Sequence, residues 1–340
     1  MQLDLAKINS FIFEPSTFCN LHCPQCPRYD TNGYLDKNLT QGHLSLDSMV
    51  KNFDLTKLPS LQNVIFEGDY GDPMMNPEID QFVNFFKDIE SIELVTNGSI
   101  RNKDYFANLA THKNLQVTFS IDGLEDTNHI YRINSNWNKT IANAKSFINA
   151  GGNATWKYII FKHNQHQVDE AQQLASELGF VNFQTQHSNR NFWGDSIWPV
   201  YIEGKYQYDL VMTDAIALDV STKSHDKANS INNDNTNFKS PECNGWMDTG
   251  KLYVNYLGHL LPCCMTSGVT WKDTISDRLF RKIIGNIDDI NLNIHNISDI
   301  EQSDFYKFRL FNSWNSVKTC HNTCVGFCSN SLNTSVEQTG

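Results

Sequence analysis

Short apolar runs alternate with helical patterns along the chain between Asn63 and His187. The runs are rich in β-branched and aromatic residues, which predicts strands over Asn63–Glu67, Ile92–Thr96, Gln116–Ile121, Thr155–Phe161 and Asn182–His187. The intervening segments carry apolar residues three and four apart, which predicts helices over Gln81–Ile89, Lys103–His112, Lys139–Ala150 and Val168–Leu178. This order predicts parallel strands with right-handed crossovers, hence an α/β barrel or open sheet.

Capping residues mark several helix ends. Ser45 precedes the apolar positions Leu46 and Met49 and predicts a further helix start. Gly151 and Gly179 follow two of the predicted helices, in the position after the C-cap that favours glycine.

Polar, glycine-bearing strings follow the predicted strands. Gly68–Pro73 follows Val64–Glu67, and Asn97-Gly98 follows Leu94–Thr96. Ser120-Ile121-Asp122-Gly123 follows the next strand. Because reactive groups of α/β folds gather where parallel strands end, we expect these strings to converge on one rim.

A CxxxCxxC triplet, Cys19, Cys23 and Cys26, follows the first apolar run, Phe11–Glu14. Three thiolates close in sequence can hold three corners of a 4Fe-4S cube and leave the fourth iron open to a small molecule. The alternatives are a zinc site and structural cysteines. Spacing favours the iron-sulfur site.

The remaining six cysteines lie in a C-terminal block: Cys243, Cys263, Cys264, Cys320, Cys324 and Cys328. Ser221–Ser240, before this block, is rich in Ser, Asn, Asp and Lys and is typical of a linker or surface loop. The sequence after Ser329 is polar, as frayed termini are.

Composition narrows the class of protein. The chain of 340 residues has a net charge of −11, without a Lys/Arg run, so nucleic acid is a poor first guess for the substrate. No stretch approaches the roughly 20 apolar residues that cross a bilayer, and residues 1–7 lack the regions of a signal peptide. We therefore expect a cytoplasmic protein without a membrane partner, whose cysteines are metal ligands or catalytic groups rather than disulfides.

With its triplet and strand-end strings, the chain resembles the radical S-adenosylmethionine (SAM) superfamily. The resemblance implies a partial (β/α)6 TIM-like barrel in which Cys19, Cys23 and Cys26 bind a 4Fe-4S cluster whose open iron chelates SAM. It also implies reductive cleavage of SAM to methionine and a 5′-deoxyadenosyl radical, which abstracts hydrogen from a substrate. Such an enzyme is expected to be anaerobic and to need an external one-electron reductant of the flavodoxin or ferredoxin type.

The resemblance also implies SAM contacts. These are Gly71, Asp72, Asn97, Ser120, Asp122 and Arg132, the last as a partner of the SAM carboxylate. Each residue also has a structural alternative to a SAM contact, which is a turn for the short strings and a surface ion pair for the arginine. The acid at position 72 is Asp where the family usually has Glu, and Gln25 stands where many members have an aromatic residue near adenine. Phe18 or Tyr29 can substitute for that aromatic.

The C-terminal block resembles the auxiliary-cluster domain called SPASM, or its shortened form, twitch. Lys251–Tyr256 and the turn Leu257-Gly258 predict a hairpin whose second arm delivers Cys263. The resemblance implies one additional 4Fe-4S cluster, with candidate ligands Cys243, Cys263, Cys320 and Cys324 and with Cys328 as a competitor. Cys264 is expected to be a buried small hydrophobe, and zinc is the alternative occupant.

These expectations divide the chain into a barrel over residues 1–215, a linker over 216–240, an auxiliary-cluster domain of hairpin plus helix over 241–330 and a tail over 331–340. The candidate reaction is dehydrogenation of a sugar-like or aminocyclitol-like small molecule. The alternatives are a maturase of peptide or protein side chains and a non-catalytic electron-transfer protein. Candidate proton acceptors are Asp69, Tyr70 and His187, and candidate sugar-binding aromatics are Trp193, Trp198 and Tyr201.

Overall fold

The computed structural model describes residues 2–188, 196–213, 247, 249–272, 274–315, 319–320 and 324. The chain divides into two compact units. The central unit comprises Glu14–His43 and Asn63–Asn232, and the terminal unit comprises Met1–Phe13, Leu44–Gln62 and Asn233–Gly340. The predicted linker 216–240 and tail 331–340 lie outside the described residues.

Five parallel strands form the sheet of the central unit, and each pairs with the next in sequence. They are β2 (Asn63–Phe66), β3 (Ser91–Thr96), β4 (Leu115–Ser120), β5 (Asn153–Ile160) and β6 (Asn182–His187). All five were predicted from the sequence, with bounds that differ by at most two residues. The α/β class and the mostly parallel pairing are therefore confirmed.

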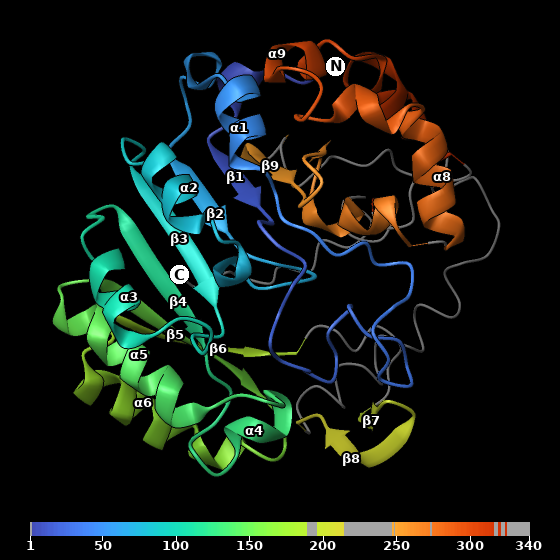
Figure 1. Cartoon of the computed structure of the whole chain (residues 1–340). Helices are drawn as coiled ribbons and strands as arrows, with labels where there is room; N and C mark the ends of the chain where they lie inside the picture. The colour runs from blue at the N-terminus through green and yellow to red at the C-terminus, as the bar shows by residue number, and fades with distance from the viewer. Residues whose placement is uncertain are drawn as a thin grey trace. The chain divides into compact units, whose positions relative to one another are not determined.

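Four helices alternate with these strands and lie along one side of the sheet (Figure 1): α2 (Ile79–Phe85), α3 (Lys103–Leu109), α5 (Trp137–Asn149) and α6 (Val168–Leu178). The short helix α4 (Asn128–Tyr131) precedes α5 in the connection between β4 and β5. Phe119 of β4 packs against Phe106 of α3 and Phe147 of α5, with ring centroids 5.4 and 6.4 Å apart. Gly179 adopts the left-handed conformation at the end of α6, as predicted.

The opposite side of the sheet is polar. Because side chains alternate along a strand, Thr118 and Ser120 face away from the side that Phe119 occupies. Thr118 donates to the Glu93 carboxylate over 2.7 Å, and Gln116 donates to Thr155 over 2.9 Å. By register, the same side carries Lys157, Gln184 and Gln186, together with the apolar residues Ile65, Val95 and Ile159. We call this side the polar face.

A hairpin of β7 (Ile197–Ile202) and β8 (Lys205–Val211) completes the described part of the central unit. Its turn places Glu203 and Gly204 at positive φ, and their backbone NH groups donate to the Gly33 and Asn32 carbonyls. Trp198 packs against the buried cluster that contains Val200 and Leu210, so it has a core role, whereas Trp193 lies outside the described residues.

The terminal unit contains a smaller set of strands. β1 (Ser10–Phe13) runs parallel to β9 (Lys251–Val254), and β10 (Leu260–Leu261) is antiparallel to β9. Its helices are α1 (Leu46–Asn52), α8 (Ile275–Ile284), α9 (Ile297–Glu301), α10 (Leu310–Ser313) and the π-helix Phe305–Arg309. The Ser45 hydroxyl accepts from the Ser48 NH at the start of α1, which confirms the predicted cap.

The turn between β9 and β10 is the predicted hairpin. The Asn255 side chain accepts hydrogen bonds from the Leu257 and His259 backbone NH groups, and Gly258 supplies a φ of +82°. His259 is 5% exposed, and its side chain lies against Asn291. The prediction that the second arm leads directly into Cys263 is confirmed.

No helix in the described residues has both the length and the apolar character needed to span a membrane.

The hairpin predicts a pH dependence of stability. Burial lowers the pKa of His259 from 6.5 to about 4, so the unfolded chain binds this proton more readily than the native state does between these pH values. Stability should therefore rise with pH from about 4 to 6.5, with a contribution from this group of at most about 1.4 kcal/mol per pH unit. Denaturant titrations of wild type and H259Q across this range measure the difference in slope, and equal slopes would contradict the assignment.

Candidate functional site

The three cysteines of the triplet lie on one loop of the central unit. Two tight turns organise it, because the Cys26 NH donates to the Cys23 carbonyl and the Tyr29 NH donates to the Cys26 carbonyl. All three thiols are partly buried. Burial, with the charges of Asp72 and Cys23, raises the pKa of Cys19 to about 12. The thiols thus lie close enough to act on one another electrostatically.

Glycine at position 71 lets two loops approach closely. A Cβ there would lie 2.0 Å from the carbonyl oxygen of Ser16, closer than any side chain permits. The next residue continues the contact, since the Asp72 NH donates to the Phe18 carbonyl over 2.9 Å. The string after β2 is therefore held against the start of the cysteine loop.

Asp72 is 3% exposed and holds neighbouring groups with its carboxylate. It accepts hydrogen bonds from the Met74 NH, the Thr96 hydroxyl and the Asn97 NH. Burial raises the pKa of its carboxyl, against these hydrogen bonds. Asn97, so positioned, directs its side-chain NH2 to the Cys19 sulfur at 3.7 Å.

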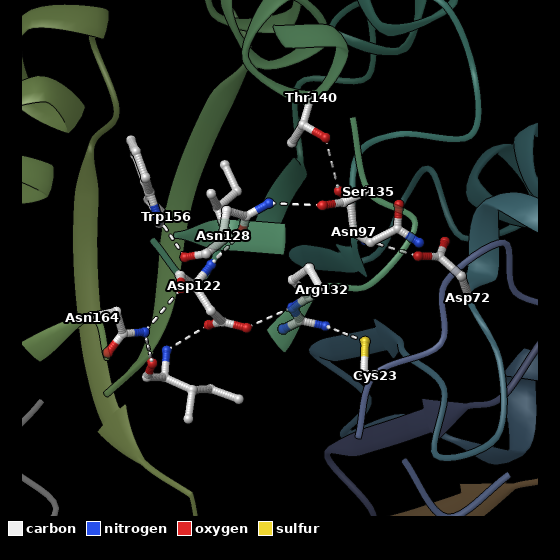
Figure 2. A network of polar contacts seen from close by, with 12 residues as sticks. Cys23, Asp72, Asn97, Asp122, Asn128, Arg132, Ser135, Thr140, Trp156 and Asn164 are labelled. Carbon is white, nitrogen blue, oxygen red and sulfur yellow. Dashed lines mark hydrogen bonds and ion pairs between the residues drawn. The ribbon is translucent and has the colours of Figure 1, made fainter. Parts of the chain in front are cut away.

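Arg132 bridges a second carboxylate and a second cysteine (Figure 2). Its Nε donates to Asp122 Oδ2 over 2.5 Å, and its Nη1 lies 3.8 Å from the Cys23 sulfur. Burial raises the pKa of the Cys23 thiol and the Arg132 charge opposes this. Burial also raises the pKa of Asp122, again against the arginine. A buried carboxylate therefore orients a cation onto a sulfur.

Two asparagines hold the Asp122 segment in place (Figure 2). The Asn128 side chain accepts from the Asp122 NH at 2.9 Å and donates to the Ser135 hydroxyl at 3.0 Å. The Asn164 side chain donates to the carbonyls of Asp122 and Ile159. The Ile159 NH in turn donates to the Asp122 carboxylate at 2.6 Å.

The structure places the other predicted site residues as follows. Ser120 ends β4 and pairs in register with Lys157. Asp69 is half-buried, and Tyr70 is 4% exposed with its backbone NH on the Glu14 carboxylate. His187 ends β6, is exposed and lies 3.2 Å from the Thr213 hydroxyl. The triplet, Asp72, Asn97, Asp122 and Arg132 are thus brought together by direct contacts, whereas the contacts described for His187 do not reach the cysteines.

The aromatic residues of the cysteine loop are engaged within the loop. Tyr29 stacks on His22 with ring centroids 3.7 Å apart, and Phe18 lies 4.9 Å from the His43 ring. Gln25 is 6% exposed and accepts a hydrogen bond from the Ser188 hydroxyl.

Sequence reasoning missed a second arginine beside the triplet. Arg28 is 4% exposed and lies over the Tyr29 ring at 5.4 Å, and in the described part of the chain its Nε and Nη1 have no hydrogen-bond partner. The Arg28 charge adds to burial in lowering the pKa of His22. Its position two residues after Cys26 is the sequence signal that could have identified it.

The second set of cysteines lies in the terminal unit. Cys263 caps the 3-10 helix Cys264–Thr270, and Cys320 and Cys324 are buried. Cys263 and Cys264 are both partly buried, so Cys264 is less buried than the sequence predicts. Cys243 and Cys328 lie outside the described residues.

The triplet fits an iron-sulfur cluster by the chemistry of its donors. Three thiols lie on one loop, and two of them, those of Cys19 and Cys23, face side-chain N–H donors from Asn97 and Arg132. Within the described ranges, no three His, Cys, Asp or Glu side chains have the geometry to hold a single metal ion. In a cube each thiolate binds a different iron, so the sulfurs need not converge on one point.

Residues 13–178 match the family model described as the radical SAM superfamily. This segment is similar to radical SAM domains. It contains the triplet, Asp72, Asn97, Asp122 and Arg132, so the contacts among these residues lie within the matched segment. The family implies a 4Fe-4S cluster and SAM binding.

Solved structures share the fold. SuiB of Streptococcus suis bound to S-adenosylmethionine matches with a TM-score of 0.55 and 16% identity, over 91% of this chain and 66% of that one. SuiB bound to the precursor peptide SuiA has a TM-score of 0.58, 16% identity and coverages of 90% and 66%. Native anSMEcpe with bound AdoMet and the Cp18Cys peptide has a TM-score of 0.55, 16% identity and coverages of 94% and 88%.

The chain therefore spans just under two thirds of the length of SuiB. A comparison with curated proteins finds no match.

The hydrogen bonds of Asn128 beside Asp122 should contribute to the stability of the fold. N128A removes the acceptor of the buried Asp122 NH and the donor to Ser135, so it should lower the free energy of unfolding by about 1–3 kcal/mol. N138A removes an exposed hydrogen bond to Glu125 and should change it by less than about 0.5 kcal/mol. Denaturant unfolding of the two variants measures the difference in the free energy of unfolding. An equal decrease in both would show that the buried hydrogen bonds of Asn128 contribute no more than the exposed one of Asn138.

Proposed function

We propose that this protein is a radical SAM enzyme whose cluster is held by Cys19, Cys23 and Cys26. The supporting observation is the pair of sulfur contacts within the matched segment, from Asn97 to Cys19 and from Arg132 to Cys23. With its cluster and SAM bound, such a site supplies a 5′-deoxyadenosyl radical that removes hydrogen from an unactivated C–H bond.

The other site residues position this centre. Gly71 offers its backbone for the SAM amino group, at the close approach to Ser16. Asp72 acts through Asn97, since its carboxylate oxygens accept from Thr96 and the Asn97 NH. Ser120 and Asp122 end β4 at the same rim, and Arg132 carries the charge that suits a carboxylate.

A polar small molecule, such as a sugar or an aminocyclitol alcohol, is the substrate class that we propose. The polar face supports it, because hydroxyls and amines need hydrogen-bonding partners such as Glu93, Gln116 and Lys157. Dehydrogenation of such an alcohol removes a hydrogen atom, which the 5′-deoxyadenosyl radical would take, together with a proton and an electron, and the auxiliary cluster proposed below would accept the electron. Asp69, Tyr70 and His187 are the candidate proton acceptors.

Maturation of a peptide side chain is the second candidate. The observation that favours it is the fold shared with SuiB, solved with its precursor peptide, and with anSMEcpe, solved with a peptide. A peptide needs a backbone-binding edge as well as a polar wall, and β6 is the last strand of the central sheet, with a largely exposed polar sequence.

We further propose one auxiliary 4Fe-4S cluster in a SPASM or twitch-type arrangement in the terminal unit. Its candidate ligands are Cys243, Cys263, Cys320 and Cys324, with Cys328 as the competitor. The hairpin that leads into Cys263 and the burial of Cys320 and Cys324 support this. An external reductant of the flavodoxin or ferredoxin type, and a cytoplasmic, anaerobic setting, belong to the same proposal.

The decisive experiment separates the two clusters. Anaerobically reconstituted wild type should carry about eight iron atoms per chain and cleave SAM to methionine and 5′-deoxyadenosine when reduced. Because Cys19, Cys23 and Cys26 bind the SAM cluster, C19A/C23A/C26A should retain about four iron atoms and lose cleavage entirely. Iron quantitation and product chromatography measure both outcomes.

C264A is the matched control, since Cys264 is a cysteine outside the proposed ligand sets. It should keep both the iron and the cleavage. Absence of SAM cleavage in iron-loaded wild type would contradict the proposed function. A colourless triple variant that holds zinc would instead contradict the auxiliary cluster alone.

A further inference from the structure

We propose that Arg132, positioned by Asp122, raises the reduction potential of the cluster through the Cys23 sulfur. Arg132 would thus act on a cluster ligand, which is a role separate from binding a SAM carboxylate. This inference rests on the proposed function, because it requires a cluster on Cys19, Cys23 and Cys26.

The guanidinium of Arg132 has a partner on two of its nitrogens. Nε is committed to Asp122 Oδ2, and Nη1 is directed at Cys23 with 3.8 Å between nitrogen and sulfur. The side chain of Arg132 is 16% exposed and that of Asp122 is fully buried. A long side chain held by a buried partner keeps one orientation, so the contact to sulfur is a fixed feature of the site.

Backbone hydrogen bonds fix the pair of Arg132 and Asp122 relative to the cysteine loop. The His22 NH donates to the Ile133 carbonyl over 3.1 Å, which joins the residue before Cys23 to the residue after Arg132. The Arg132 NH donates to the Asn128 carbonyl over 2.8 Å, and the Asn128 side chain also accepts from the Asp122 NH. Arginine, carboxylate and cysteine are therefore placed by these backbone bonds together with the side-chain contacts of Asp122, Arg132 and Cys23 that Figure 2 shows.

The charge of Arg132 should raise the reduction potential of the cluster. Reduction adds negative charge to a cluster, and a cation or an N–H donor at a ligand sulfur stabilises the more negative state. Arg132 provides both, in a partly desolvated position where charges act strongly. Asp122 opposes the charge directly, but it also holds the cation at the sulfur.

Cys19 offers an internal comparison. Its side-chain donor is the neutral amide of Asn97 at 3.7 Å, held by Asp72 through the Asn97 backbone. The two sulfurs thus have donors of similar distance but different charge. We attribute the larger share of the tuning to Arg132, because it alone of the two carries a full charge.

The test is a potentiometric titration of the reconstituted full chain, followed by electron paramagnetic resonance. The signal of the SAM cluster is identified as the one that C19A/C23A/C26A lacks. R132Q removes the charge and should shift the midpoint potential of that signal to a more negative value, whereas R132K keeps the charge and should shift it less. R101Q is the matched control, because the contacts described for Arg101 are the Asn76 carbonyl and the Tyr105 ring.

The positioning role of Asp122 is tested by adding D122N to both backgrounds. In R132Q, D122N removes only a negative charge and should raise the potential. In the wild type it also releases Arg132, so the rise should be smaller.

The outcomes separate the two proposals. If C19A/C23A/C26A keeps every signal that the wild type shows, the assignment of the cluster to these cysteines is overturned, and the proposed function with it. A cluster whose potential is the same in wild type and R132Q would overturn the tuning role alone. Equal shifts from D122N in the two backgrounds would show that Asp122 does not act through the arginine.

Discussion

The buried contact between Asp122 and Arg132 is the interaction on which the rest of the site depends. A guanidinium that loses most of its water needs a counter-charge, and the carboxylate of Asp122, itself fully buried, needs the same. Each group is tolerable only because the other is present. Loss of either partner would leave the other as an unpaired buried charge. The Ile159 NH donates to the Asp122 carboxylate, and the Asn164 and Asn128 side chains bind the Asp122 backbone. What results is a cation held in one place beside Cys23.

A buried carboxylate also positions the donor at Cys19, and this donor is neutral. Asp72 is buried, and its carboxylate oxygens accept hydrogen bonds from the Thr96 hydroxyl and the Asn97 NH. Both carboxylates therefore contact a residue that itself contacts a cysteine sulfur. A buried carboxylate that holds an asparagine or an arginine in this way contributes to the geometry and the electric field around the sulfurs.

Much of the fold could be predicted from the sequence, because strand and helix periodicities and capping residues are local. β6 was predicted with its observed bounds, and the caps at Ser45 and Gly179 followed from single residues. The β7–β8 hairpin was missed because Pro199 interrupts a strand pattern, although the Glu203-Gly204 turn was a usable signal. Asn164 could not be predicted, since its role depends on carbonyls that only the folded chain brings to it.

The polar face sets the limit on what such a centre can act upon. Parallel sheets are usually covered on both sides by apolar groups, so strands buried on both faces read as continuous hydrophobic runs. Here the helices cover the Phe66 and Phe119 side, while on the other side Thr118 donates to Glu93 and Gln116 donates to Thr155. Hydrogen bonds within such a row are exchangeable for bonds to a ligand, at little net cost for each exchange. A hydroxyl-rich or amine-bearing molecule can make that exchange, and an apolar one cannot. The polar substrate class that we propose thus follows from how β3, β4 and β5 present their alternate residues.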